Sequence, residues 1–126
     1  MLQEKNRLKK TRDIEIVLEN GKFLGGALVT MKYWKIVPEK YPKRGYTVDD
    51  LKIGFVVGLK VSKKAVIRNR LKRQMREVIR LYVKENTIPL GFMILLFAKK
   101  EMIDQSYDLI AKDIEGLLRR ARLLQK

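Results

Sequence analysis

The chain has 126 residues, the size of a single domain, and carries 29 Lys and Arg against 14 Asp and Glu, a formal net charge of +15. It contains neither Cys nor His, which excludes disulfides and thiolate metal sites and removes the usual general base and the commonest metal ligand. Because so many positive charges repel one another in a compact chain, the composition indicates a polyanionic partner, most commonly nucleic acid.

The N-terminal part of the chain predicts a basic arm followed by a short helix. Residues 1–10 form the arm and contain no apolar stretch of the kind found in secretory signals. Thr11 is a suitable cap for a helix over residues 11–20, because its hydroxyl can accept a hydrogen bond from a backbone N–H of the first turn. Gly21 is expected to end that helix.

The next part predicts strands around a loop. Residues 22–37 are rich in β-branched and aromatic types and favour strand structure, which Gly25 and Gly26 interrupt either as a bulge or as a break between a short strand and a longer one. Residues 38–51 contain Pro, Gly and paired Asp residues and predict a mobile loop. Apolar residues alternate over 52–59, which predicts a strand whose buried face is Ile53, Phe55, Val57 and Leu59.

The C-terminal half predicts a helix, a strand and a second helix. Residues 63–84 lack Gly and Pro and favour a long helix. Residues 92–98 are apolar throughout, which is typical of a strand buried on both faces. Ser106 can cap a last helix over residues 106–123. The core stripe expected for this helix is Tyr107, Ile110, Ile114, Leu117 and Ala121.

The order helix, strands, helix, strand, helix predicts an α/β (α+β) two-layer sandwich, with helices packed on one sheet of about four strands. No linker or internal repeat divides the chain, so we expect residues 1–126 to form a single domain. The longest apolar run, residues 92–98, is far shorter than a membrane span. These features favour a cytoplasmic protein with no membrane partner.

The candidate functional segment is residues 60–84, which contain ten Lys or Arg residues and one acid, Glu77. A solvated helix face usually mixes charges of both signs. Here Arg68, Lys72 and Arg76 are spaced four apart, and like charges at that spacing destabilise a helix. We infer that phosphates neutralise them, since Arg binds phosphate in bidentate fashion. At roughly 100° per residue, the apolar residues fall in one sector: Ile67, Leu71, Met75, Val78, Ile79 and Tyr82.

A longer pattern within this segment points to a family. Residues 65–77 read A-V-x-R-N-R-x-K-R-x-x-R-E, which resembles the signature of the protein subunit of bacterial ribonuclease P. The resemblance covers almost the whole chain. It implies an αβββαβα sandwich with a left-handed crossover, an exception to the usual hand. Further matching stretches are Arg7-Leu8-Lys9-Lys10 with Asp13 and Gly21, Lys52-Ile53-Gly54, and Gly91-Phe92.

The resemblance implies an RNA-binding subunit of an endoribonuclease holoenzyme that removes the 5′ leader from precursor tRNA. In this family the catalyst is a large RNA that uses Mg²⁺, so the protein is expected to supply no catalytic residue, metal ligand or bound cofactor. The expected partners are the catalytic RNA and the precursor tRNA leader, bound by a monomeric protein. The residues assigned to RNA binding are Lys60, Lys63, Lys64, Arg68, Asn69, Arg70, Lys72, Arg73, Arg76 and Arg80.

The resemblance also implies a leader cleft between the first helix and the sheet. Ile14 and Leu18 occupy positions that are often Phe in the family. Stacking of a base on an aromatic ring contributes about 1–3 kcal/mol, so an aliphatic cleft should hold the leader more weakly or through backbone charges. We hypothesise that Lys32 and Tyr33 partly compensate. The full set of cleft candidates is Arg7, Lys10, Ile14, Leu18, Lys32 and Tyr33.

Three other functions remain open from the residues alone. A ribosomal or other structural RNA-binding protein would show the same charge pattern, and Asn69 could equally be an ordinary surface residue. A membrane-surface protein could use a basic amphipathic helix, although the strand-like segments favour a packed globule. A protein nuclease would need metal-binding carboxylates, for which the candidates are Asp13, Asp104, Asp108 and Asp113.

Overall fold

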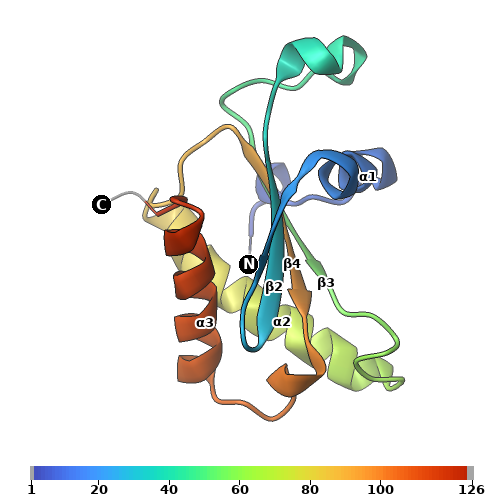
Figure 1. The fold of residues 1–126 in the computed structure, drawn as a ribbon, viewed down its shortest axis with the longest axis vertical. Helices are drawn as coiled ribbons and strands as arrows, with labels where there is room; N and C mark the ends of the chain where they lie inside the picture. The colour runs from blue at the N-terminus through green and yellow to red at the C-terminus, as the bar shows by residue number, and fades with distance from the viewer. Residues whose placement is uncertain (1, 125–126) are drawn as a thin grey trace.

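The computed structural model describes residues 2–124, which form three α-helices and four strands (Figure 1). Met1 of the expected arm and residues 125–126 of the expected domain lie outside the described residues. The order of elements confirms the αβββαβα succession and the α+β class. The elements are α1 (Thr11–Asn20), β1 (Lys22–Gly25), β2 (Val29–Lys35), β3 (Leu51–Val56), α2 (Ala65–Lys84), β4 (Phe92–Ala98) and α3 (Tyr107–Arg120).

The strands form one mixed sheet in the order β1-β2-β4-β3. β2 pairs antiparallel with both β1 and β4, whereas β3 and β4 are parallel neighbours. α2 therefore links two adjacent parallel strands, and this is the connection for which a left-handed crossover is expected. The hand of the connection stays a prediction.

β4 lies inside the sheet and is buried on both faces, as its apolar sequence predicts. Ile94 and Leu96 pack into a core with α2 and α3, whereas Met93 and Leu95 pack against Ile16 of α1 on the opposite face. None of these five side chains is exposed to solvent. α2 and α3 thus cover one face and α1 part of the other (Figure 1). The two-layer description is incomplete, because α1 adds a third, partial layer.

The helices on the first face follow their apolar periodicity. α2 begins at Ala65 and buries four residues of its expected stripe. Ser106 caps α3 as expected, its hydroxyl accepting a hydrogen bond from the Leu109 N–H at 3.2 Å. Within residues 2–124, no helix is both long and apolar enough to cross a membrane. The buried residues of α2 are Leu71, Met75, Val78 and Ile79, and those of α3 are Ile110, Ile114, Leu117 and Leu118.

Three local expectations are wrong. Leu59 is 67% exposed, because β3 ends at Val56 and the chain turns away from the sheet before α2. Tyr107 is 45% exposed, because it is the first residue of α3 and lies one turn before the helix meets the core at Ile110. Thr11 is inside α1 rather than its cap; the cap position is Lys10, which makes no side-chain capping bond.

The N-terminal arm is docked along the open edge of β3. The Leu8 N–H donates to the Ile53 carbonyl at 3.1 Å, and the Asn6 side-chain amide donates to the Leu51 carbonyl at 2.8 Å. A Cβ at Gly54 would lie 3.0 Å from the Leu8 carbonyl oxygen, so this close approach requires glycine. The arm thereby satisfies the backbone groups of an edge strand that would otherwise be free to pair with another chain.

The segment 38–51 is more ordered than a mobile loop. It contains two 3₁₀ turns, Pro38–Lys40 and Pro42–Arg44, and its last residue is the first residue of β3. Tyr46 is only 8% exposed and packs edge-on against Trp34, with ring centres 5.9 Å apart. Aromatic packing therefore holds this segment on the α1 face of the sheet.

A buried carboxylate joins this segment to α1. Asp13 is 4% exposed, and its Oδ1 accepts hydrogen bonds from the Tyr46 hydroxyl and the Arg44 guanidinium, both at 2.5 Å. Burial alone would raise the pKa of Asp13, but the bonds from Tyr46 and Arg44 outweigh it and hold the pKa below its usual value. Burial, reinforced by the hydrogen bond to Asp13, raises the pKa of the Tyr46 phenol.

We expect Asp13→Asn to lower the free energy of unfolding at pH 7 by about 2 kcal/mol, the scale for hydrogen bonds to a charged group. A depressed carboxyl pKa contributes stability above the unfolded value of about 3.9 and loses it as pH falls. The difference between wild type and Asp13→Asn should therefore shrink below about pH 4, as urea unfolding at several pH values would measure. The exposed Asp108→Asn is the control. A difference that is constant with pH would contradict the ionised network.

Candidate nucleic-acid interface

α2 carries a row of cations with i, i+4 spacing along one flank. The row continues beyond the three residues recognised in the sequence, because Arg80 and Lys84 extend it to the last residue of the helix. The side chains before Lys84 are half-buried, so they lean against the body of the protein rather than into open solvent. Burial of the adjacent apolar stripe in the core fixes the direction in which the row points. Its members are Arg68, Lys72, Arg76, Arg80 and Lys84.

A groove lies between this row and the N-terminal arm. Its first part is a pocket of about 310 Å³ whose floor is β3, with cations from both walls. The Arg76 guanidinium lies 5.9 Å from the centre of the Phe55 ring, a cation–π contact that holds it over the floor. The cations that line this part are Arg7 and Lys9 from the arm and Lys72 and Arg76 from α2.

The other expected RNA-binding residues occupy different sides of the same helix. Asn69 and Arg73 are exposed on its outer surface. Arg70 lies on the flank away from the arm, where its guanidinium is 3.4 Å from the Asp104 carboxylate. Lys60, Lys63 and Lys64 are exposed in the loop that precedes α2. The motif thus surrounds α2 rather than forming one compact cluster, and RNA contact by each residue stays a prediction.

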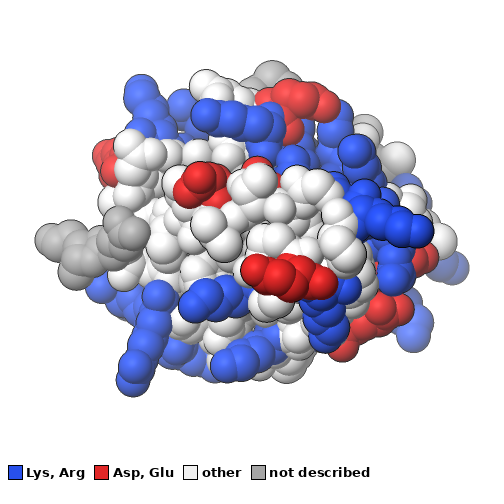
Figure 2. Space-filling view, turned by 90° about the horizontal axis from the view of Figure 1, so that it is seen from above, with Lys and Arg blue, Asp and Glu red and all other residues white. Residues whose placement is uncertain are grey.

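The charge of the molecule is unevenly distributed. Figure 2 shows one face with blue side chains around much of the margin and acidic side chains among uncharged ones nearer the centre. α2, in contrast, has one acid, Glu77, in 20 residues. Glu77 is exposed and contacts Arg80 at 3.3 Å, leaving the rest of the row without an acidic partner on its own helix. Most of the positive charge of α2 is therefore not balanced by acidic residues of the same helix.

The expected leader cleft forms only in part. Ile14 is half-buried and Leu18 is 42% exposed on α1. The Lys32 amino group donates to the Leu18 carbonyl at 2.7 Å, which ties β2 to α1 on this face. These three residues are therefore neighbours on the α1 side of the sheet. Lys10 is exposed at the start of α1.

Two of the six cleft candidates lie on the other face. Side chains alternate along a strand, and Tyr33 packs with the core beneath α2 and α3 whereas Lys32 faces α1. Arg7 bridges Ile53 on the edge of the sheet, and its side chain lines the groove beside α2. The expectation that Tyr33 and Arg7 share a cleft with Ile14 and Leu18 is wrong for this reason.

Two aromatic residues on the α1 side of the sheet are not among the leader-binding candidates that the sequence indicates. Phe23 pairs with Lys32 across β1 and β2 and is 60% exposed. Phe97 of β4 is half-buried and packs at the border of the core beneath α1. The sequence marks both only as aromatic strand residues, because the face that each one occupies depends on a register set by non-local pairing.

The acidic residues do not gather into a metal site. Residues 2–124 contain no group of three or more Asp and Glu side chains placed to hold a metal ion. Asp13 is engaged by Arg44 and Tyr46, and Asp113 accepts backbone hydrogen bonds from Ala27, Leu28 and Val29 at 2.9–3.0 Å. These carboxylates hold the fold together, and the expected lack of a protein-bound metal stays a prediction.

Curated relatives match over nearly the whole chain. The family model described as Ribonuclease P matches residues 2–122. A ribonuclease P protein component from a Synechococcus strain is 31% identical over 126 residues, covering 98% of this chain and 87% of its own length. The corresponding protein of Microcystis aeruginosa is 31% identical over 123 residues, covering 98% of this chain and 96% of its own.

Solved structures agree in fold. The ribonuclease P protein of Thermotoga maritima superposes with a TM-score of 0.71 at 28% identity, covering 91% of this chain and 96% of its own. The Staphylococcus aureus protein has a TM-score of 0.75, covers 94% and 97%, and at 24% identity shows the shared fold. The chain therefore belongs to the ribonuclease P protein family, the protein subunit of the ribonucleoprotein endoribonuclease that matures the 5′ end of tRNA.

Proposed function

We propose that this protein, as a monomer in the cytoplasm, binds a catalytic RNA through α2 and the 5′ leader of precursor tRNA through the α1 face of the sheet. The observation that carries the proposal is the five-cation row of α2, which lies beside a groove with further cations on its opposite wall. Like charges at i, i+4 spacing are unfavourable in the free helix. An RNA backbone relieves that repulsion and releases its own counterions.

The leader surface has a different chemistry. Phe23 offers an exposed ring on which a base can stack, and Lys32 on the adjoining strand can approach a phosphate. Leu18 and Ile14 supply an apolar border rather than aromatic rings. We therefore infer that Lys32 and Phe23, rather than Lys32 and Tyr33, compensate for the lack of aromatic side chains at these two positions of α1.

The protein contributes binding rather than bond chemistry in this proposal. The Asp13 and Asp113 carboxylates serve as hydrogen-bond acceptors within the fold, and the Mg²⁺ of the reaction would belong to the RNA–protein holoenzyme. Electrostatic neutralisation of closely approaching RNA segments is the contribution that α2 can make, because its cations form a row along one flank of the helix.

Precursor-tRNA cleavage at low Mg²⁺ tests the proposal with three samples: this protein, a bacterial ribonuclease P RNA, and the two mixed. Only the mixture should cleave efficiently. Arg68→Ala with Arg73→Ala should weaken stimulation by roughly a hundredfold or more, because each of the two lost bonds to a charged group costs about 1.5–3 kcal/mol. Lys100→Ala with Lys112→Ala removes the same charge from exposed positions elsewhere and should have little effect. No stimulation by the wild-type protein would leave a structural RNA-binding protein as the alternative, and cleavage by protein alone would establish a nuclease.

Binding of the catalytic RNA should be steeply dependent on salt. If about six phosphates are engaged, affinity should fall on the order of a thousandfold between about 50 and 200 mM salt. Filter binding or fluorescence anisotropy at four or five salt concentrations would give the slope. A flat response would contradict the electrostatic account of α2.

Phe23→Ala should weaken binding of precursor tRNA to the holoenzyme by about 1–3 kcal/mol, the value of one stacked base. The same change should leave binding of mature tRNA unaffected, because mature tRNA has no leader. Phe23→Tyr, which keeps the ring, should behave like wild type. Equal losses for precursor and mature tRNA would instead place Phe23 outside the leader path.

A further inference from the structure

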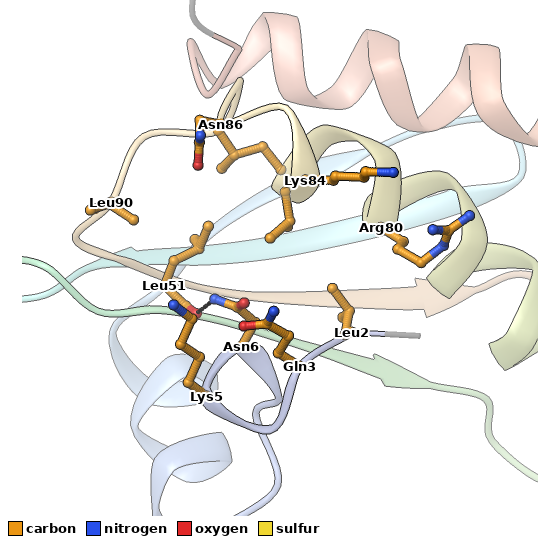
Figure 3. A pocket seen from close by; sticks show the side chains of 11 residues that line it. Leu2, Gln3, Lys5, Asn6, Leu51, Arg80, Lys84, Asn86 and Leu90 are labelled. Carbon is orange, nitrogen blue, oxygen red and sulfur yellow. Dashed lines mark hydrogen bonds between the residues drawn. The ribbon is translucent and has the colours of Figure 1, made fainter.

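The groove beside α2 continues past Leu2 into a second and larger pocket. This pocket has a volume of about 470 Å³ and lies between the N-terminal arm, the start of β3, the C-terminal half of α2 and the turn that follows it (Figure 3). Leu2 lines both pockets. The volume is within the range of small-molecule sites. The residues around it are Leu2, Gln3, Lys5, Asn6, Leu51, Arg80, Val83, Lys84, Asn86, Ile88 and Leu90.

The lining combines three kinds of group. Lys5, Arg80 and Lys84 provide positive charge, and no acidic side chain lines the pocket. Lys84 alone would be an ordinary complement to the negative end of the helix dipole. Lys5, which comes from a different segment, and Arg80, a full turn earlier, give more charge than that explanation needs. The amide side chains of Gln3, Asn6 and Asn86 and several aliphatic side chains form the remaining walls, so the pocket suits an anionic ligand that also has polar and apolar parts.

Asn6 supplies the specific polar contact. It is 8% exposed, and its Nδ2 donates to the Leu51 carbonyl at 2.8 Å, which fixes the orientation of the amide. The oxygen end of the side chain is consequently turned away from Leu51, as Figure 3 shows. No side chain or backbone N–H among residues 2–124 donates to this Oδ1. A ligand in the pocket can therefore donate one hydrogen bond to it.

Arg80 has unused donor capacity at the same pocket. One of its terminal nitrogens contacts Glu77 at 3.3 Å, whereas its Nε is buried and has no acceptor among the described residues. A buried donor without a partner destabilises a fold, and an anion that draws the guanidinium toward the pocket would relieve that cost. Asn6 and Arg80 thus line the same pocket, Asn6 with a free acceptor and Arg80 with a donor that movement of its guanidinium could expose.

We propose that this pocket binds one nucleotide of a single-stranded RNA segment. The phosphate would contact Lys5, Arg80 and Lys84, a ribose hydroxyl or base amino group would donate to Asn6 Oδ1, and the base would lie against Leu51 and the other aliphatic walls. Both a nucleotide in a chain and a free nucleotide have this chemistry, but continuity with the groove favours a chain. The proposal rests on RNA being the ligand of α2.

The geometry fits a strand that follows the groove. Lys72 and Lys84 are 12 positions apart on one helix, so the cation row beside the two pockets extends about 18 Å at 1.5 Å per residue. A strand that enters at the Phe55 floor can therefore continue past Leu2 to the second pocket. The pocket is separated by the sheet from the α1 face, where the leader surface lies.

Nuclear magnetic resonance titration can locate the ligand directly. The probes are inorganic phosphate, adenosine monophosphate and a hexa-adenylate RNA, and the reporters are the side-chain amides of Gln3, Asn6 and Asn86 and the methyl groups of Leu51 and Val83. Hexa-adenylate should shift these signals at a much lower concentration than adenosine monophosphate, and phosphate should leave the methyl groups unchanged. Equal affinities for adenosine monophosphate and hexa-adenylate would contradict the binding of an RNA strand and would identify a free nucleotide as the ligand. Shifts confined to other surfaces would overturn the site.

A charge-matched comparison supplies an independent test. Arg80→Gln with Lys84→Gln should reduce the salt slope for hexa-adenylate binding by about 1.4, or about 0.7 for each lost phosphate contact on a single strand. Lys100→Gln with Lys112→Gln should keep the wild-type slope at the same net charge. Equal slopes in the two double variants would refute the pocket. The proposed function would survive that result if Arg68→Ala with Arg73→Ala still weakened cleavage, so the two failures are distinguishable.

Discussion

The helix α2 buries a narrow apolar stripe while it concentrates positive charge beside that stripe. Leu71, Met75 and Ile79 are fully buried, and they hold α2 against the sheet despite a row of like charges on the adjacent flank. Burial of each such side chain contributes about 1.5–3 kcal/mol, which exceeds the few tenths lost per repelling i, i+4 pair. Packing therefore stabilises a charge arrangement that the helix would not favour by itself. Binding of a polyanion relieves the repulsion between these charges.

The N-terminal arm turns that charged helix into a groove. Without the arm, β3 would be an open edge, and the cations of α2 would lie above exposed backbone. The arm pairs with β3 at Ile53, and the missing Cβ of Gly54 allows the close contact. The arm also brings Lys5, Arg7 and Lys9 to the wall opposite α2. The docking of the arm on β3 thus creates both pockets and adds three cations to the four that α2 supplies.

The sheet keeps two different binding chemistries apart. β4 is buried on both faces and separates the core beneath α2 and α3 from the core beneath α1. One side offers dense cationic contacts and the other offers Phe23 beside Lys32. On the α1 side, Asp13 fastens the 38–51 segment through Arg44 and Tyr46. That network explains why a segment rich in turn residues packs against Trp34 instead of remaining a loop.

Local sequence determined the features that depend on near neighbours: the apolar stripe and cation row of α2, the cap at Ser106, the doubly buried β4, and the absence of His and Cys chemistry. The family signature at residues 65–77 was equally visible, because it is one continuous segment. The face that each strand residue occupies, in contrast, follows from strand pairing and long-range packing. Lys32 and Tyr33 are adjacent in sequence yet lie on opposite sides, and Phe23 gains importance only through its pairing with Lys32. The burial of Asp13 likewise depends on Tyr46, 33 positions away. The orientation of the Asn6 amide depends on Leu51, 45 positions away. Such contacts are decided by register and long-range packing, which no local pattern encodes.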